Sequence, residues 1–578
     1  MIGLIAATAA GRRAAVDLAE SLGDCVLYEE GSVSASLERA WEECAQLVCF
    51  LAAGAVVRLV APLLEDKRDD PGVVCVDEGR RFAVALLGGH GGGANALAAT
   101  VGAALGAVPV VTTATDATGV PGLDTLGWHT EGEVAAVSRA LLDGEPVRLA
   151  ADAVYPLPAL PANVRADAPA GAPAIVISDR LDAPAAAPGS GAAVVLRPRS
   201  LVVGVGASRG APAEEVLGLV EAALAGAGLS RHSVNCLATV DAKAEEPGLL
   251  EAARALGVEL VAYPAERLAA VAVPNPSEAP LAAVGTPSVA EAAALAGGGE
   301  LLVPKRKSAP EGRAAMATVA IVRRPPRGRL ALVGLGPGAR DLLTPRAREE
   351  LRRASVVVGL DQYVDQIRDL LRPGTRIEQT GLGAEEARAL SAVHLAEQGH
   401  AVALIGSGDA GVYAMASPAL AGAGPEIDVV GVPGVTAALA ASSLLGAPLG
   451  HDHVSISLSD LHTPWEVIER RVRAAAEADL VVTFYNPRSR GRGWQLPKAL
   501  GLLAEHREPS TPVGVAHAVS RPDEWHTLTT LAGLDVTTVD MTTVVVVGNT
   551  ATREIAGRMV TPRGYRWQAV GERSEEKA

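Results

Sequence analysis

Aromatic residues are scarce in this chain, and it has neither a long apolar run nor a positive net charge. Aromatic side chains make up 3% of the 578 residues although 49% are hydrophobic, so the cores must be built from Ala, Val and Leu. Such cores suit parallel sheets, whose buried strands are unbroken aliphatic runs. Lys and Arg number 51 against 66 Asp and Glu, a net charge of −15 that excludes a global basic field for nucleic acid or anionic membranes. An anionic ligand must therefore meet a local basic pocket.

Cysteine is also scarce, and its spacing excludes the common cysteine frameworks. The five cysteines contain no CxxC pair, which argues against zinc and disulfide frameworks and predicts buried, reduced thiols. We predict no metal site. No apolar run approaches the roughly 20 residues of a membrane helix, and the N-terminus lacks the basic region of a signal peptide. A cytoplasmic protein is therefore expected.

The alternation of aliphatic runs with Gly-rich turns and helical patterns predicts a multidomain α/β protein. We place an N-terminal α/β domain at 1–130, a mid-domain with Ala/Pro-rich connectors at 131–200 and another α/β unit at 201–323. A linker at 324–329 leads to a further α/β domain at 330–565, and 566–578 forms a tail.

A Gly-rich run with one histidine follows a predicted strand of the first domain. It extends from Gly88 to Asn95 and precedes a helical pattern, so Asn95 is expected to cap that helix while free N–H groups face an anion. His90, between flexible glycines, can approach a ligand closely. A glycine turn with an exposed histidine explains the run equally well.

The unit at 201–323 opens with a glycine loop that matches a dinucleotide fingerprint poorly, because Arg209 stands where glycine is required. A more unusual cluster follows the next predicted strand, where Asp241, Lys243 and Glu246 could form an acid/base set at a sheet edge. Lys305, among three cations, ends a later strand near that edge. A solvated charged loop is the alternative explanation of the cluster.

These motifs, in this order, resemble the cobalamin-biosynthesis CbiG family of cobalt-precorrin-5A hydrolases over about residues 1–323. The family opens a lactone on the ring A acetate and releases acetaldehyde. We predict His90, Lys243 and Glu246 as catalytic residues. Asn95, Asp241 and Lys305 are the predicted substrate-binding residues. Ala207-Ser208 stands where the family carries Cys-Arg, which excludes a cysteine nucleophile there.

The C-terminal part contains the same pattern three times: an aliphatic strand followed directly by a loop of small residues. The loops lie at 334–338, 406–412 and 432–437. In a parallel sheet such loops share the carboxyl edge, where ligands bind. Thr344 is expected to cap a helix that begins with Pro345.

The patterns Gly334-x-Gly-Pro-Gly, Ser407-Gly-Asp and Pro433-Gly-Val-Thr-Ala are similar to the tetrapyrrole methyltransferase family, which binds S-adenosylmethionine between two α/β subdomains. Further segments, at 446–452, 455–466, 485–489 and 547–549, resemble its precorrin-3B C17-methyltransferases. The expected fold class is therefore α/β and multidomain, with N-terminal α/β hydrolase-like units followed by a two-subdomain tetrapyrrole methyltransferase (class III) fold.

This resemblance also implies site residues for the C-terminal half. The cofactor contacts are expected from Gly336, Pro337, Gly338, Ser407, Gly408, Asp409, Val412, Thr436, Ala437 and Asn486. His451 and Asp452 are the catalytic candidates, and Asp460, Thr463 and Arg488 the substrate-binding ones. A polar loop that caps helices, or a solvated basic loop, would explain the last five residues without a site.

We therefore expect a bifunctional enzyme of cobalamin biosynthesis that methylates C17 and opens a lactone on a tetrapyrrole substrate. No nucleic acid or membrane partner is predicted, and a homodimer through the methyltransferase domain is expected. An alternative is a methyltransferase that carries a non-catalytic tetrapyrrole-binding module at its N-terminus. An NAD-dependent oxidoreductase would need the dinucleotide fingerprint that both glycine loops lack.

Overall fold

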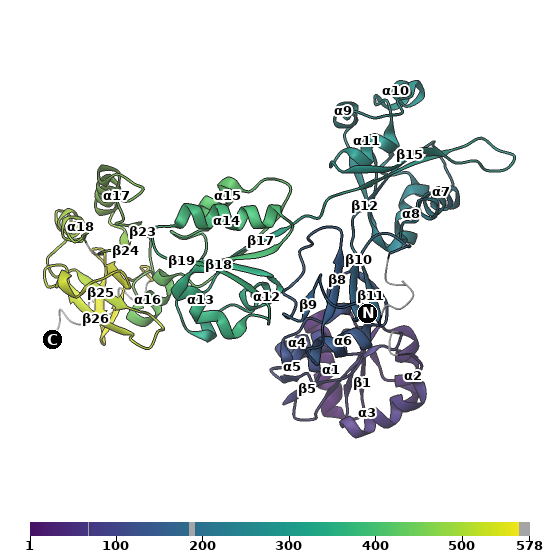
Figure 1. Cartoon of the computed structure of the whole chain (residues 1–578). Coiled ribbons are helices and arrows are strands. Elements are labelled where there is room, and N and C mark those ends of the chain that lie inside the picture. The colour runs from purple at the N-terminus through teal and green to yellow at the C-terminus, as the bar shows by residue number, and fades with distance from the viewer. Residues whose placement is uncertain (67–68, 184–190, 490, 566–578) are drawn as a thin grey trace. The chain divides into compact units, whose positions relative to one another are not determined.

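The computed structural model describes residues 1–66, 69–183, 191–489 and 491–565 (Figure 1), and the predicted tail lies outside them. These residues form a mixed α/β protein with several separate sheets, as the sequence predicts. Contacts divide the chain into two compact units. Unit 1 contains Met1–Val154, Leu160–Pro326 and Arg372–Gly374, and unit 2 contains Tyr155–Ala159, Arg327–Leu371 and the chain from Thr375 onward. Within the described ranges, no helix has the length and apolarity to cross a membrane.

The first sheet of unit 1 has the strand order β2-β1-β3-β4-β5-β6, parallel except between β4 and β5. Its strands are β1 Ile2–Ala6, β2 Cys25–Tyr28, β3 Gln46–Phe50, β4 Gly72–Val76, β5 Phe82–Leu87 and β6 Val108–Val110. Helices α1 (Ala9–Leu22) and α4 (Ala94–Leu105) pack on one face, and α2 (Val33–Glu43) and α3 (Ala53–Val60) on the other. Aliphatic strands therefore lie between two helical layers.

All five cysteines are free thiols, and all except the half-buried Cys25 are buried. Cys49 and Cys75 lie in the core of this first sheet. Burial raises the pKa of the Cys49 thiol, and it raises the pKa of Cys75 to about 11. The predicted burial of the cysteines is confirmed for the four that lie in the core.

Two further sheets complete unit 1. The second has the order β7-β11-β10-β8-β9, with β7 antiparallel to its neighbour. Its elements are β7 His129–Gly132, β8 Val147–Ala151, β9 Val164–Arg165, β10 Ala174–Ile177 and β11 Ala193–Arg197, with α5 Ala114–Thr118 and α6 Val134–Leu142. The third has the order β14-β13-β12-β16-β15, in which β16 is antiparallel to both neighbours.

The strands of the third sheet are β12 Leu201–Ala207, β13 Val234–Val240, β14 Glu259–Tyr263, β15 Glu300–Lys307 and β16 Ala317–Arg323. Helices α7 (Ala213–Gly226) and α8 (Pro247–Leu256) pack on one face, while α9 (Ala265–Ala269) and α11 (Val289–Leu295) pack on the other, with α10 (Glu278–Val284) between them in the chain.

Unit 2 begins with a fully parallel sheet of order β19-β18-β20-β17-β21. Its strands are β17 Arg329–Gly334, β18 Val356–Leu360, β19 Arg376–Thr380, β20 Ala401–Gly406 and β21 Asp428–Val432. Helices α14 (Glu385–Glu397) and α15 (Ala416–Gly422) cover one face, and α12 (Pro345–Arg353) and α13 (Asp361–Ile367) the other. Thr344 caps α12 through a bond from the Ala347 N–H, as predicted.

The second main sheet of unit 2 has the order β23-β24-β27-β25-β26. Its strands are β23 His453–Ser457, β24 Val481–Tyr485, β25 Pro512–His517, β26 Trp525–Thr530 and β27 Thr543–Val547. Helices α17 (Trp465–Glu477) and α18 (Gln495–Ala504) pack on one face and α16 (Ala437–Leu445) on the other. A small sheet of order β22-β29-β28 contains β22 Gly446–Ala447, β28 Arg553–Ile555 and β29 Arg558–Val560.

Candidate functional site

Three loops meet at the carboxyl ends of β17, β20 and β21 in unit 2. Gly336 and Gly408 exchange both backbone hydrogen bonds, at 3.0 and 2.8 Å. The half-buried Asp409 joins the third loop, because its Oδ1 accepts the Gly411 N–H at 2.8 Å and its Oδ2 the Gly434 N–H at 3.0 Å. Asp409, which was predicted to bind the cofactor, therefore joins the second loop to the third.

Close backbone packing explains why glycine recurs at this edge. A Cβ on Gly434 would lie 2.0 Å from the Gly408 carbonyl oxygen, which is far inside van der Waals contact. Gly338 and Val412 continue the first two loops, and Ala437 is the first residue of α16. The three loops thus form a cradle of main-chain atoms, and a Cβ at its narrowest point would disrupt it. Such a cradle fits a nucleoside cofactor that packs closely against backbone.

Side chains from the second sheet close the same edge. Thr436 Oγ1 lies 2.6 Å from Tyr485 Oη, and the ring of Tyr485 lies 5.2 Å from that of Tyr413. Asn486 follows β24 directly with a left-handed backbone (φ 48°), and its Nδ2 donates to Ser457 Oγ at 3.1 Å. The structure therefore brings the predicted Thr436 and Asn486 together through Tyr485, which the sequence reasoning did not select.

Arg521 was also missed, although it reaches the first two loops. Its Nε donates to the Pro337 carbonyl at 3.0 Å and its Nη2 to Ser407 Oγ at 3.5 Å. The neighbouring Ser520 accepts the Ala339 N–H at 3.0 Å. Ser520 and Arg521 begin a polar run soon after β25, and that position after a strand is the signal that could have found them.

His451 and Asp452 lie at the opposite end of the second sheet from Asn486. Both precede β23, whereas Ser457 ends it, and β24 runs parallel to β23. A strand of five residues spans roughly 16 Å. The His451 and Asp452 side chains are 47% and 81% exposed, and with others they line a separate cavity of about 420 Å³. The chain therefore does not bring these catalytic candidates to the glycine loops.

The predicted substrate-binding residues of unit 2 lie beyond the strand ends that carry Asn486. Asp460 and the half-buried Thr463 follow β23, and Arg488 follows β24. Asp460 Oδ2 accepts from Gln495 Nε2 at 3.0 Å, and Arg488 Nη1 donates to a main-chain carbonyl at 3.0 Å. Each keeps further hydrogen-bonding capacity for a ligand, since a carboxylate and a guanidinium form several bonds.

In unit 1, His90 has an acidic partner that the sequence reasoning missed. His90 Nε2 lies 2.7 Å from Thr115 Oγ1 and 3.4 Å from Asp116 Oδ2, and the imidazole is 19% exposed. The two loops follow β5 and β6, which are parallel neighbours. A polar run directly after the neighbouring strand was therefore the available signal. A carboxylate beside an imidazole is a recurring arrangement for acid/base catalysis.

The predicted N-cap role of Asn95 is wrong. Helix α4 begins at Ala94, and its N-cap is Gly93 with a left-handed backbone (φ 75°). Asn95 lies in the first turn, where its Nδ2 donates to Thr113 Oγ1 at 3.0 Å and to Asp116 Oδ2 at 2.9 Å. Its side chain thus joins the His90 loop to the Asp116 loop instead of capping the helix.

Lys243 and Glu246 form an ion pair of 3.2 Å in which the side chains are 19% and 10% exposed. The Gly210 N–H donates to Glu246 Oε1 at 2.5 Å. That bond, and then Lys243, lower the pKa of the Glu246 carboxyl. A carboxylate kept ionised in this way is a weak proton acceptor, so His90 is better suited as the base. No hydrogen bond or ion pair between described residues joins this pair to His90.

Asp241 and Lys305 bond within the third sheet of unit 1. Asp241 Oδ1 accepts the Ala242 N–H at 2.7 Å where β13 turns into a short 3-10 helix. Lys305 Nζ donates to the Asn275 carbonyl at 2.5 Å, while its N–H donates to the buried Glu291 at 2.9 Å. These contacts give both residues a structural role at the positions where substrate contacts were predicted.

Three family models match parts of the chain. The model of tetrapyrrole (corrin/porphyrin) methylases matches residues 329–535. The model of the cobalamin synthesis G C-terminus matches 201–322, and that of the cobalamin synthesis G N-terminal region matches 35–116. The methylase match contains the glycine loops, and the other two contain His90 and the Lys243–Glu246 pair.

Curated relatives agree with the methylase match. The chain is 47% identical over 239 residues to a Salmonella typhimurium protein named "Probable cobalt-factor III C(17)-methyltransferase", with 41% of this chain and 99% of the relative covered. It is 40% identical to the precorrin-3B C(17)-methyltransferase of a Sinorhizobium species, over 41% of this chain and 97% of that one. The match to the cobalt-factor III methyltransferase of Priestia megaterium, at 43% identity, covers 41% of this chain and 45% of the relative. The solved structure of the methyltransferase CobJ is 40% identical, with a TM-score of 0.39 over 41% of this chain and all of that one.

Proposed function

Because the chain belongs to the tetrapyrrole (corrin/porphyrin) methylase family, we propose that unit 2 methylates C17 of a corrin precursor and promotes contraction of its ring. The methyl donor is S-adenosylmethionine. Unit 1 opens the ring A lactone of a later intermediate and releases acetaldehyde. The observation that carries the proposal is a C17-methyltransferase relative matched over 99% of its length in a chain that also carries both cobalamin synthesis G regions.

S-adenosylmethionine supplies an activated methyl group on a sulfonium, so the chain has to bind and orient it more than to activate it. The loops at 334–338 and 406–412 would hold the nucleoside and amino acid parts against main-chain atoms, with Thr436 and Asn486 on the side of the second sheet. Methyl transfer disperses charge, which makes alignment in a dry pocket the main contribution of the protein. Arg488 would pair with a substrate carboxylate.

Lactone opening needs a water activated by a base and a group that stabilises the oxyanion. His90 supplies the base in this proposal. With Asp116 and Thr115 beside Nε2, the imidazole proton resides on Nε2 and the lone pair on Nδ1, which takes the proton of the attacking water. The ammonium of Lys243 or the N–H groups after His90 stabilise the oxyanion. Water adds to the carbonyl carbon, the lactone C–O bond breaks, and the proton taken up by His90 passes to the leaving oxygen. Acetaldehyde then leaves when the carbon–carbon bond between the freed carbinol carbon and the ring breaks, with the hydroxyl proton lost and a proton added to the ring carbon.

The test uses the full chain with S-adenosylmethionine and tri-methylated precursor, supplied both metal-free and loaded with cobalt. Methylated product with one of the two precursors supports the proposal for unit 2, and no product with either refutes it. Acetaldehyde release from the lactone intermediate is then measured for the parent protein and for His90→Ala, Lys243→Ala and Glu246→Ala. Removal of a general base should slow release by about 10²–10⁴-fold.

Each variant carries its own folding control, because C17 methylation by unit 2 is measured in the same sample. Parent-like acetaldehyde release from all three variants would refute this site. Absence of acetaldehyde release from the parent would favour the second candidate, a tetrapyrrole-binding module. The ion pair between Lys243 and Glu246 motivates this candidate, because each residue already has a partner within the protein. The proposed homodimer through unit 2 is tested by sedimentation of the same preparation.

A further inference from the structure

Three side chains of types that commonly bind metals gather within unit 1, and none of them belongs to the His90 loops or to the Lys243–Glu246 pair. His129 and Glu131 belong to β7, and His232 belongs to the 3-10 helix Arg231–Ser233 that precedes β13. One ligand atom from each residue lies within 4.8 Å of the other two. In the described part of the chain, this is the single group of three such side chains that close together. Its members come from a strand of the second sheet and from a 3-10 helix that leads into the third sheet.

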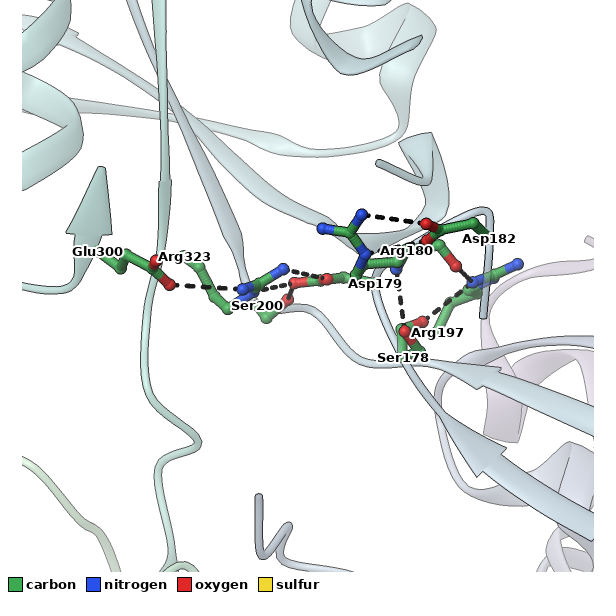
Figure 2. A network of polar contacts seen from close by, with 8 residues as sticks. All are labelled: Ser178, Asp179, Arg180, Asp182, Arg197, Ser200, Glu300 and Arg323. Carbon is green, nitrogen blue, oxygen red and sulfur yellow. Dashed lines mark hydrogen bonds and ion pairs between the residues drawn. The ribbon is translucent and has the colours of Figure 1, made fainter. Parts of the chain in front are cut away.

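A buried arginine fixes the carboxylate of this group. Arg197 is 4% exposed, and its Nε and Nη2 donate to the two Glu131 oxygens at 3.1 and 2.6 Å. Its Nη1 donates to the Ser178 and Arg180 carbonyls at 3.1 and 2.7 Å, and Figure 2 shows these residues side by side. Carboxylates that bind metals are commonly hydrogen-bonded by such outer partners. Each Glu131 oxygen keeps a lone pair for a second interaction.

The arginine itself belongs to a wider polar network. In that network, Asp179 is 3% exposed and accepts two bonds of 2.7 Å from Arg323, and Ser200 donates to it at 2.8 Å (Figure 2). Asp179 precedes Arg180, whose carbonyl binds Arg197. The network therefore links the end of β16 and the start of β12 to the segment that positions the guanidinium.

The two imidazoles lie face to face, with 3.5 Å between ring centroids and 12° between ring planes. His129 Nε2 is 3.8 Å from Glu131 Oε1. A tetrahedral ion with bonds of about 2.1 Å holds neighbouring donors about 3.4 Å apart. His129 and Glu131 therefore need to close by about 0.4 Å, and no pair of donors by more than about 1.4 Å. Each nitrogen lone pair lies in its own ring plane, and one ring must therefore turn about its side-chain bonds to address the same ion.

We propose that His129, Glu131 and His232 bind one divalent transition-metal ion of the zinc, cobalt or nickel class. Two imidazoles and one carboxylate suit these ions better than magnesium or calcium, which prefer oxygen ligands. Three protein ligands leave a fourth position for water. The ion would link β7 of the second sheet to the 3-10 helix that precedes β13 of the third. This site departs from the sequence prediction of no metal, which rested on cysteine spacing.

The test uses the full chain after dialysis against a chelator. Zinc affinity is measured by competition with a chromophoric chelator, and cobalt(II) is added separately because its visible absorption reports nitrogen and oxygen ligands around the ion. Loss of an outer partner typically weakens metal binding by about 10–100-fold. We therefore expect His129→Ala and His232→Ala to weaken zinc by at least about 100-fold, and Glu131→Gln by at least about 10-fold.

Matched controls are His394→Ala and His506→Ala, two exposed histidines of unit 2. They should bind zinc like the parent, and magnesium should not compete in any sample. Circular dichroism confirms the fold of each variant, and His129→Gln replaces His129→Ala if the latter does not fold. The proposal is overturned if the parent binds no stoichiometric zinc, or if the three cluster variants bind it as tightly as the controls do.

Discussion

Replacement of Asp409 by alanine removes the acceptor of two main-chain bonds, from Gly411 at 2.8 Å and from Gly434 at 3.0 Å. Hydrogen bonds to a charged group contribute about 1.5–3 kcal/mol each, and partial exposure of the half-buried carboxylate favours the lower end. The loss of both therefore costs about 2–3 kcal/mol of loop order. If the cofactor has to restore that order when it binds, its affinity falls by about 30–150-fold, since 1.4 kcal/mol corresponds to a factor of ten.

Calorimetric titration of S-adenosylmethionine into the full chain measures this loss. Asp409→Asn keeps one acceptor oxygen and should lose less affinity than Asp409→Ala. The control is Asp365→Ala, since Asp365 is 66% exposed on α13 and forms an ion pair with the neighbouring Arg368. Parent-like affinity in a folded Asp409→Ala protein would show that the loops order without the carboxylate and would refute this role of Asp409.

Three further outcomes are expected. Gly434→Ala would place a Cβ 2.0 Å from the Gly408 carbonyl oxygen. This overpacking should destabilise unit 2 by about 1–3 kcal/mol and lower its thermal midpoint accordingly. The control is Gly431→Ala, which should leave the midpoint unchanged because, apart from the adjacent residues, no atom lies within 4 Å of the added Cβ. The lowered pKa of Glu246 adds stability that is complete above its ordinary value of 4.5 and is lost as the pH falls through the folded value. Urea unfolding of Glu246→Gln should thus differ from the parent at pH 7 and converge with it in acid. A thiol reagent at pH 8 should label Cys25 in the folded protein and Cys75 only after unfolding, because Cys75 is buried with a pKa of about 11 whereas Cys25 is half-buried. Equal labelling rates in the folded protein would contradict this.

Local signals predicted the framework of the fold well. Thr344 and Pro345 specify the start of α12 with two adjacent residues, and the structure confirms it. The glycine loops of unit 2 share one sheet edge because all five strands of that sheet are parallel, which the aliphatic runs indicate. In these cases the physical cause lies within a few residues of the chain.

Contacts between distant segments were not available from the same patterns. The Asn95 side chain does not cap its helix but donates hydrogen bonds to Thr113 and Asp116, which follow a different strand. His129 and His232 are about 100 residues apart in the sequence, so their proximity depends on how the second and third sheets pack. His451 was predicted from the resemblance of its motif to the family. The direction of β23 nevertheless places it at the opposite end of the sheet from Asn486.

The hydrogen bonds that join Ala339 to Ser520 and Pro337 to Arg521 have a consequence for protein engineering. The loop after the first strand of the first sheet of unit 2 is hydrogen-bonded by two side chains from a segment about 180 residues later in the chain. Replacing either sheet alone with that of a relative would therefore break these two hydrogen bonds. A chimera should therefore transfer 329–560 as one piece. The short connection between β16 and β17 is the natural crossover point, because a junction there keeps both partners of each bond in the same parent.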